Sequence, residues 1–426
     1  MTWPTPWSSW RRICRRASPA SRSPLPAAFS RTDERRGDAM TIDVVGSDVP
    51  TIPPLPPVYS ERIADTQERL RAGEFSLEQM PGYIKGQRPT TDVWHHIDHL
   101  EIYPKVWGRE CGKNGIGKLR EVVLTEITDS EKFAFHDLDP AYFPQMADAY
   151  SSIDIPKMID QSLAYEAALE AHGVIVHRVA FPQPPVSAFG PAKSTWAAAE
   201  LFVLRGGSVL PKRGVQPLAY GRAEYLALWA WTRLGVPVLC AVTGTGIFEI
   251  GPCHFLAEDV FVSGNGMAFN DEGLAQMKPV IARSAGLDVE DMTFLHIEFP
   301  GNKYYDAPSG VGHHPDLYIA PLDVRKVVTY SPGLDFATLE WLRKRGYTIV
   351  EVEHSEQAQY APANILPLEP GLVVMHAEAT QSIASVRAAG VEVIEVPYSE
   401  FMKEGGGLHC STGQIWREKG PYSTDT

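Results

Sequence analysis

Reactive side chains recur at one position of a repeated sequence pattern, at the start of a short apolar segment. They are Glu200, His254, His314, Asp316, His409 and Cys410. A thiol becomes a nucleophile when a neighbouring base or cation helps it to lose its proton. Carboxylates hold cationic groups through charge-assisted hydrogen bonds. If the repeated units are arranged around a common axis, these groups meet at one site.

Cys410 is the candidate nucleophile. It follows Gly405, Gly406 and Gly407, and glycine permits close backbone approach and unusual dihedral angles. The alternative is that Cys410 is a small buried apolar residue, which is the common state of a lone cysteine in a strand. The glycine run and the adjacent His409 favour the nucleophile, with His314 as the base that activates it.

His314, Pro315 and Asp316 form an H-x-D sequence at the start of a predicted strand. Side chains two residues apart in a strand point to the same face, so His314 and Asp316 are expected to reach one ligand. The alternative is a capped turn in which Asp316 bonds only to the backbone.

A fivefold repeat is expected to position these residues. Five predicted helices each end at a glycine that is followed by an apolar strand, at Gly173, Gly235, Gly286, Gly346 and Gly390. Glycine supplies the left-handed residue that commonly ends a helix. The glycines stand roughly 45 to 60 residues apart, a spacing typical of repeated folds. Each unit reads strand, tight turn, strand, helix, glycine, strand, and the predicted hairpins cover 200–210, 253–264, 316–330 and 364–375.

Apolar spacing defines the inner faces of two of these helices. Phe336, Leu339 and Leu342 are expected on one buried face before Gly346, with Asp335 as the N-cap. In another unit, Leu226, Leu228 and Trp229 lead toward Gly235.

The fifth unit is split between the two ends of the chain. Residues 119–126 and the helix before Gly173 lie near the N-terminus, whereas 408–416 lie near the C-terminus. Pairing of the two segments would close a ring and leave no exposed sheet edge. An open stack of units is the alternative. The sequence therefore predicts an α/β fold, a five-bladed pseudo-symmetric α/β propeller closed by pairing of its N- and C-terminal segments.

Four segments resemble one known enzyme group. G-G-G-L-H-C-S-T at 405–412 is similar to the C-terminal cysteine motif of the amidinotransferase and arginine deiminase group, the guanidine-modifying enzymes of the pentein fold. H-P-D-L-Y-I-A-P-L at 314–322 resembles their H-x-D strand. Residues 200–210 resemble the strand that carries R-D in the family, and 363–375 resemble the fourth hairpin. The resemblance covers about 106–418.

The resemblance implies a covalent mechanism without a cofactor or a metal ion. Cys410 would attack the carbon of a guanidinium group, and His314 would protonate the departing amine and then activate a second nucleophile. Asp316 and Glu200 would hold the guanidinium nitrogens. An amine as second nucleophile gives amidino transfer, and water gives hydrolysis.

The sequence departs from the family pattern at several positions. The R-D pair is replaced by Ala199-Glu200, and Glu249 stands where an acid orients the catalytic histidine. His254 takes the place of an aspartate, so His254 and His409 are assigned to substrate binding. Residues 331–333 carry no arginine to hold a substrate carboxylate. These changes affect substrate binding more than the nucleophile.

Composition limits the remaining classes. The net charge of −13 argues against a nucleic-acid partner, and no apolar run is long enough to cross a membrane. Five scattered cysteines without a C-x-x-C pair indicate a reducing compartment, and we expect a cytoplasmic protein. The Arg-rich residues 1–39 also suit an organelle-targeting peptide, but an upstream extension before Met40 is favoured.

The expected domains are a disordered extension with a Pro-rich linker (1–57), a helical or irregular segment (58–105), the propeller (106–420) and a tail (421–426). His95 and His99 have helical i, i+4 spacing, but they lack an adjacent glutamate and are interpreted as a packing or surface cluster, not a metal site. The loop 301–312 is a candidate gate or an ordinary solvated loop.

The leading hypothesis is a cysteine-dependent amidinotransferase that acts on a guanidino compound through a covalent amidino-cysteine intermediate. Transfer is preferred to hydrolysis because of the triple-glycine form of the cysteine motif. A guanidine hydrolase or deiminase is the second hypothesis. A catalytically silent pentein that serves as a binding module is the third. The expected partners are a small guanidino substrate and, for transfer, an amine acceptor, and a homodimer is compatible with the sequence.

Overall fold

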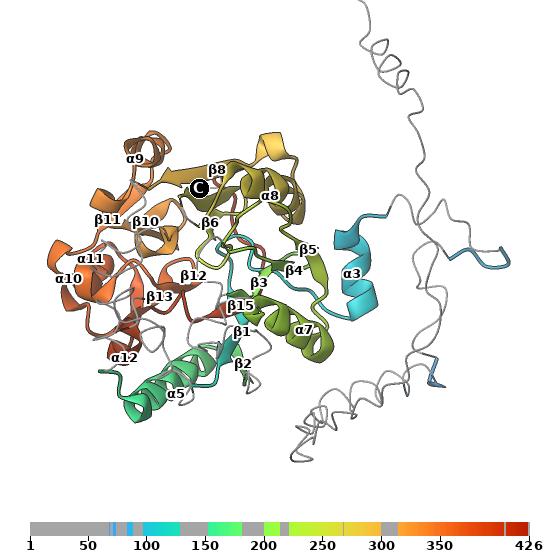
Figure 1. Cartoon of the computed structure of the whole chain (residues 1–426), viewed down its shortest axis with the longest axis horizontal. Helices are drawn as coiled ribbons and strands as arrows, with labels where there is room; N and C mark the ends of the chain where they lie inside the picture. Colours follow the sequence, from blue (N-terminus) through green and yellow to red (C-terminus); the bar gives the residue numbers. More distant parts are fainter. Residues whose placement is uncertain are drawn as a thin grey trace, which may run out of the picture. The chain divides into compact units, whose positions relative to one another are not determined.

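The computed structural model describes residues 68, 71–73, 83–87, 97–127, 152–180, 200–213, 221–266, 268–299, 314–403 and 406–424. The predicted extension and linker (1–57), His95 and the loop 301–312 lie outside these residues. The described part has an α/β fold in which several small sheets are accompanied by helices (Figure 1).

The strands form three-stranded sheets of one plan. Their orders are β15 (Gly413–Arg417), β1 (Leu119–Thr125), β2 (Ile175–Val179); β3 (Phe202–Leu204), β4 (Gly207–Leu210), β5 (Val238–Ala241); β6 (His254–Ala257), β7 (Val260–Asn265), β8 (Thr293–Glu298); β9 (Ile319–Asp323), β10 (Lys326–Thr329), β11 (Thr348–Glu351); and β12 (Leu366–Glu369), β13 (Leu372–His376), β14 (Glu392–Val396). In each sheet the middle strand is antiparallel to the first strand and parallel to the third. The four predicted hairpins are confirmed.

A helix connects the parallel strands of each sheet, because parallel neighbours need a crossover connection. These helices are α5 (Ile155–Ala171), α7 (Arg222–Leu234), α8 (Asp271–Ser284), α9 (Phe336–Lys344) and α11 (Thr380–Ala388). The other described helices are α3 (His99–Trp107), α10 (His354–Tyr360), α12 (Ser399–Met402) and the 3₁₀ turns η5 (Val289–Asp291), η6 (Pro315–Leu317) and η7 (Ser331–Gly333).

The predicted glycine ends of the crossover helices are confirmed. Gly173, Gly235, Gly286, Gly346 and Gly390 have φ angles of 77, 70, 75, 73 and 80°. After four of them the next amide donates to a carbonyl five residues earlier, as in Tyr347 to Leu342 at 3.0 Å. This is the bond of the Schellman motif, and it satisfies carbonyls that the helix end leaves without a partner.

The two ends of the described chain share one sheet. β1 pairs antiparallel with β15, and the register runs from Leu119 opposite Arg417 to Val123 opposite Gly413. β2 then joins the other side of β1 in parallel. The predicted pairing of the N- and C-terminal segments is therefore confirmed.

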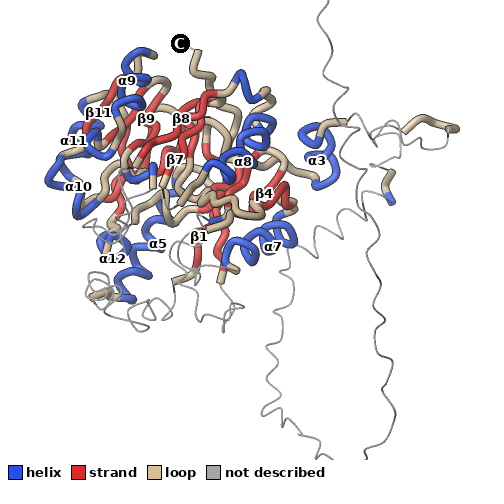
Figure 2. Tube along the Cα trace, turned by 45° about the horizontal axis from the view of Figure 1, so that its top comes forward, coloured by secondary structure: helices blue, strands red, loops and turns tan. Residues whose placement is uncertain are grey.

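Apolar clusters join each sheet to the next along the chain. One cluster combines Phe202 of β3 with Phe255 of β6, and comparable clusters connect the other successive sheets. A further cluster packs Leu119 of β1 against Leu366 of β12 and so joins the last sheet to the first. Figure 2 shows the helices α9, α10 and α11 along the edge of the described part, next to the strands. First strands of neighbouring sheets also contact one another, as β6 contacts β9 and β9 contacts β12.

Two expected helix faces need correction. Phe336 is 73% exposed and Leu228 is 53% exposed, so neither belongs to a buried face. In α9, Leu342 is buried and Asp335 accepts the amide of Thr338, as expected for the N-cap. Phe336 is the first residue of its helix, and helical spacing alone does not fix the direction of a side chain at a helix end.

Replacement of Gly346 by alanine is expected to lower the free energy of unfolding by about 1 kcal/mol, because alanine has to adopt a left-handed conformation there. No other atom lies within 4 Å of an added Cβ, so the backbone conformation is the cause of the loss. Urea denaturation measures the difference. Gly346→Asn should lose less, since asparagine tolerates this conformation; an alanine variant as stable as the wild type would contradict the argument.

Candidate active site

The candidate nucleophile Cys410 lies in the turn that precedes β15. Its Sγ is 3.3 Å from Oδ2 of Asp316 and 3.1 Å from Nδ2 of Asn364. Asn364 also accepts the amides of His409 and Cys410 through Oδ1, at 3.0 and 3.2 Å. One asparagine therefore fixes both the backbone and the sulfur of the nucleophile.

Asn364 was missed by reasoning from the sequence, although the available pattern could have found it. It stands just before β12, the first strand of the fourth repeated unit, which is the position that supplies reactive residues in the other units. Its closeness also explains one glycine of the triple-glycine run. A Cβ on Gly407 would lie 2.8 Å from Oδ1 of Asn364, a distance that forces a displacement.

Asp316 is 1% exposed and lies in η6, not in a strand. The strand β9 begins only at Ile319, so the expectation that strand alternation aligns His314 with Asp316 is wrong. Proline at 315 favours the first turn of a helix, which explains the 3₁₀ turn. The turn nevertheless brings Asp316 to Cys410 and to His409, whose Nδ1 is 2.8 Å from Oδ2 of Asp316.

Electrostatics keep the resting thiol protonated. Burial, followed by the Asp316 carboxylate, raises the pKa of Cys410 well above its usual value. Burial would also raise the pKa of Asp316, but the hydrogen bond from His409, followed by electrostatic interactions with His409 and His314, outweighs it and lowers that pKa. At neutral pH the site therefore holds a thiol beside a carboxylate.

His314 belongs to a second group of charged side chains. Its Nε2 is 3.3 Å from Oε2 of Glu249, and Arg213 Nη2 is 3.4 Å from the same oxygen. Arg213 also binds Glu200 Oε1 through Nη1 at 2.6 Å, and Arg222 binds this oxygen at 2.5 Å. Glu249 thus lies where it can orient His314, and Glu200 is held by two guanidinium groups that the sequence did not reveal.

The contacts of His314 do not include the sulfur. Among the described residues its hydrogen bond goes to Glu249, and its influence reaches the nucleophile through its effect on Asp316. The structure therefore gathers the predicted site residues into two neighbouring clusters. One is Cys410, Asp316 and His409, and the other is His314, Glu249 and Glu200.

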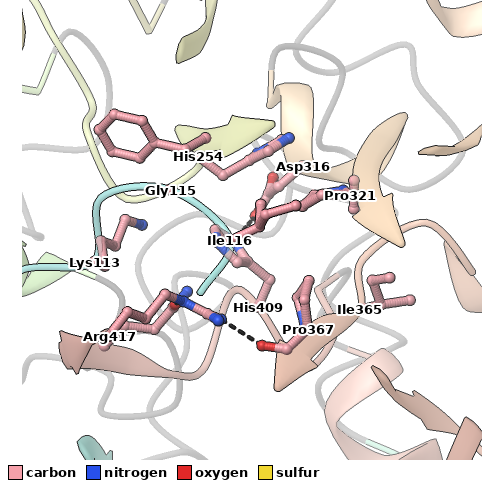
Figure 3. Close-up of a pocket in the computed structure, with 13 residues that line it drawn as sticks. Lys113, Gly115, Ile116, His254, Asp316, Pro321, Ile365, Pro367, His409 and Arg417 are labelled. Atoms are coloured by element: carbon pink, nitrogen blue, oxygen red, sulfur yellow. Dashed lines mark hydrogen bonds and ion pairs between the residues drawn. The ribbon is translucent and has the colours of Figure 1, made fainter. Parts of the chain in front are cut away.

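His254 lies behind the first cluster. It is buried, its ring meets the ring of His409 edge to face at 5.8 Å, and burial lowers its pKa to about 3. Together with Asp316 and His409 it lines a small cavity (Figure 3). Within the described residues, no hydrogen bond or ion pair joins His254 to Cys410 or His314.

The described part of the chain contains no group of three or more His, Cys, Asp or Glu residues arranged to hold a metal ion. His99 begins α3, and its Nδ1 lies 3.2 Å from Asp98. None of the helices that the structure describes combines the length and the apolarity needed to cross a bilayer.

Comparison with known proteins supports a family assignment. The arginine deiminase family matches residues 318–417. A 2-nitroimidazole nitrohydrolase from Mycobacterium sp. (strain JS330) is 32% identical over 362 residues, which is 83% of this chain and 95% of that protein.

Solved structures show the same fold at low sequence identity. AgrE, in a ternary complex with ornithine and NAD+, aligns with a TM-score of 0.55 at 17% identity. The alignment covers 71% of this chain but only 39% of AgrE. A variant of dimethylarginine dimethylaminohydrolase, as an adduct with S-methyl-L-thiocitrulline, aligns with a TM-score of 0.51 at 18% identity, over 69% of this chain and 98% of that one.

The chain belongs to the pentein superfamily that contains the amidinotransferases and arginine deiminases. It is an enzyme of this superfamily, which removes the hypothesis of a catalytically silent binding module.

Replacement of Asp316 by asparagine is expected to increase the reactivity of Cys410 while it weakens catalysis. The carboxylate raises the pKa of the thiol, so its loss lowers that pKa and increases the thiolate fraction at neutral pH. A decrease of about one pH unit makes modification by iodoacetamide about tenfold faster at a fixed pH below the midpoint. Peptide mass spectrometry at several pH values would follow Cys410. Glu356→Gln, a buried acid elsewhere, is the control, and an unchanged or higher midpoint in Asp316→Asn would contradict the assignment.

Proposed function

We propose that this protein is a cysteine-dependent hydrolase that displaces a leaving group from a carbon bonded to two nitrogen atoms. Such a carbon occurs in guanidino compounds and at position 2 of a 2-nitroimidazole ring. The observation that carries the proposal is the contact of Cys410 with both Asp316 and Asn364, next to the His314–Glu249 pair.

In this proposal the sheets form a closed five-bladed α/β propeller with the site at its hub. The apolar clusters that join each sheet to the next, and the last to the first, support this arrangement. So does the shared sheet of β1 and β15. A ring of this kind explains why residues distant in sequence, such as Asp316 and Cys410, arrive at one point.

The first chemical step forms the covalent intermediate. Sγ of Cys410 attacks the carbon, and the S–H proton leaves through Oδ2 of Asp316, 3.3 Å away. The C–S bond forms, and the bond to the leaving group breaks with both electrons on the leaving group. An amine needs a proton from His314 to depart, whereas nitrite departs as an anion. Asn364 stabilises the developing thiolate through its amide N–H.

The second step consumes water. His314, held by Glu249, takes a proton from water, and the oxygen attacks the carbon bound to sulfur. The C–O bond forms and the C–S bond breaks with both electrons on sulfur. Asp316 returns its proton to the thiolate, and after departure of nitrite His314 releases the proton from water to solvent. The product carries a carbonyl oxygen where the leaving group had been.

The state of Glu200 bears on the substrate. The sequence predicts that Asp316 and Glu200 together hold the substrate. In the structure, Glu200 forms ion pairs with Arg213 and Arg222. Asp316 is then the acid that faces the thiol, and a single acid suits a neutral planar ring better than two acids would. The similarity to a 2-nitroimidazole nitrohydrolase points the same way. A 2-nitroimidazole is therefore the first substrate to test, and a guanidino compound is the second.

Amidino transfer, the leading hypothesis from the sequence, differs only in its second nucleophile. It was preferred because of the triple-glycine motif, but Gly407 is accounted for by its close approach to Asn364. That glycine therefore carries no information about an amine acceptor. Water, which needs no acceptor site, is the simpler second nucleophile.

The proposal is tested by product analysis. The purified protein is incubated with 2-nitroimidazole and, separately, with agmatine, in the presence and absence of glycine as amine acceptor. Release of nitrite, or of ammonia with a ureido product, supports hydrolysis. Appearance of the whole amidino group on glycine would establish transfer instead. Absence of turnover on both substrates, together with no adduct on Cys410, would reject the proposal.

Cys410→Ala is expected to abolish turnover and to change the free energy of unfolding by no more than about 1–2 kcal/mol, the range of ordinary substitutions. Cys240→Ala provides a control, because Cys240 is a partly buried thiol in β5 with no role in the proposed chemistry. Residual turnover in Cys410→Ala, or a large loss of stability, would show that the thiol serves packing.

A further inference from the structure

A small cavity is lined by Asp316 and His409, and Cys410 is not among its lining residues. Its polar lining comes from Lys113, His254, Asp316, His409, Gln414 and Arg417, with Ile116, Ile365 and Pro367 among its apolar walls (Figure 3). Its volume is about 20 Å³, sufficient for one water molecule by the usual criterion.

Several buried polar atoms of the lining have no hydrogen-bond partner among the described residues. They are Oδ1 of Asp316, Nε2 of His409 and a ring nitrogen of His254. A buried polar atom left unpaired costs roughly 1–3 kcal/mol, so such atoms are nearly always paired, by protein or by ordered water. Three of them around one cavity indicate a shared polar occupant.

Lys113 supplies the donor that this occupant needs. The side chain is 6% exposed, and its Nζ donates to the carbonyl of Cys253 at 2.9 Å and lies 4.1 Å from the centre of the Phe202 ring. An ammonium group has three N–H donors, so further donors are available toward the cavity. Burial lowers the pKa of Lys113 to about 7, and the Asp316 charge acts against this decrease.

Arg417 also lines the cavity, but most of its donors are engaged elsewhere. Its guanidinium group is engaged by Oε1 of Gln414 at 2.9 Å, by the carbonyl of Gly117 at 2.8 Å and by the carbonyl of Pro367. Three of its five N–H donors are thus used, whereas Lys113 uses one of three for the Cys253 carbonyl, so Lys113 is the donor that we assign to the occupant.

We propose that the cavity binds one ordered water that accepts a hydrogen bond from Lys113 and donates one to Nε2 of His409. With Nε2 as acceptor, Nδ1 carries the proton and donates to Oδ2 of Asp316. A continuous chain of hydrogen bonds then runs from Lys113 through the water, His409 and Asp316 to the thiol of Cys410. Lys113 and His409 are positioning residues in this chain, because they act on the nucleophile through Asp316.

Other occupants fit the lining less well. A metal ion would be repelled by Lys113 and Arg417, and an anion would be repelled by Asp316. Water serves as donor and acceptor at once, and it matches a lining that contains both. It is also the occupant whose size the cavity allows.

The proposed chain of hydrogen bonds fixes the orientation of the Asp316 carboxylate. The positive charge of Lys113 at its far end partly offsets the negative charge of this carboxylate. Titratable and charged groups around this carboxylate come from several elements: Lys113 before β1, Glu249 and Cys253 before β6, His254 in β6, His314 beside η6, His409 and Cys410 before β15, and Arg417 in β15. In the proposal, Lys113 is the cation that is connected to this carboxylate through the water and His409.

A high-resolution crystal structure of the whole protein gives the first test. We expect one water within hydrogen-bond distance of Lys113 Nζ and His409 Nε2. A dry cavity, or a water bound to neither residue, would overturn the proposal.

Lys113→Met gives the second test, because it removes the charge and the donor while it keeps the length of the side chain. Without the cation, formation of a thiolate beside Asp316 is less favourable, so the pH midpoint for modification of Cys410 by iodoacetamide should rise by about one unit. Modification at a fixed pH below the midpoint would then be about tenfold slower. Lys113→Arg should restore most of the wild-type midpoint.

His254→Phe keeps Lys113 and fills the cavity. This variant tests the same proposal if Lys113→Met fails to fold. It should displace the water and shift the same midpoint upward. His376→Asn is the matched control, since His376 is a fully buried histidine 3.8 Å from an acid, Glu378, outside the site. An unchanged midpoint in both folded hub variants would overturn the proposal.

The inference rests on Cys410 as the nucleophile of the proposed function, but its readout does not depend on a substrate. If the wild-type protein turns over neither probe substrate while Lys113→Met shifts the midpoint, the proposed reaction fails and the hydrogen-bonded chain stands. If the wild-type protein turns over a substrate and the pH midpoint is unchanged in the variants, the proposed reaction stands and the hydrogen-bonded chain fails.

Discussion

The contact between the buried Asp316 carboxylate and the Cys410 thiol is the interaction on which the site depends. A buried carboxylate is costly unless it is hydrogen-bonded, and His409 supplies that bond at 2.8 Å. The same carboxylate raises the pKa of the thiol and so keeps it protonated at rest. At rest, Cys410 is therefore held as a thiol in contact with Asp316.

The fold brings Asp316 and Cys410 together from distant parts of the sequence. Asp316 comes from η6 in the middle of the chain and Cys410 from the turn before the final strand. The sheet shared by β1 and β15 anchors the second, and the apolar clusters between neighbouring sheets fix the first. Asn364 bridges them, since it bonds to the carbonyl of Asp316 and to the sulfur of Cys410. A small displacement of Asp316, Asn364 or Cys410 would change the hydrogen bonds of the Cys410 thiol.

The second cluster, His314, Glu249 and Glu200, is held together by ion pairs with arginine side chains. Glu249 holds His314, and Arg213 holds Glu249 and Glu200 together. An acid that the family pattern would assign to a substrate is thereby engaged by the chain itself. These ion pairs offset the negative charge of Glu200, and they do not involve Cys410.

The sequence by itself determined the repeated unit, because glycine at Gly346 and its equivalents is required by a left-handed backbone and hairpins follow from local turn chemistry. It also singled out Cys410, His314 and Asp316 as candidate reactive residues, and their catalytic roles stay predictions. Only the tertiary structure decided that Asp316 contacts the thiol, that Glu200 is held by Arg213 and Arg222, and that His254 lies behind the site. Local periodicity even gave the wrong element for Asp316. The reason is physical: backbone preferences act over a few residues, whereas ion pairs and burial are set by the packing of segments far apart in the chain.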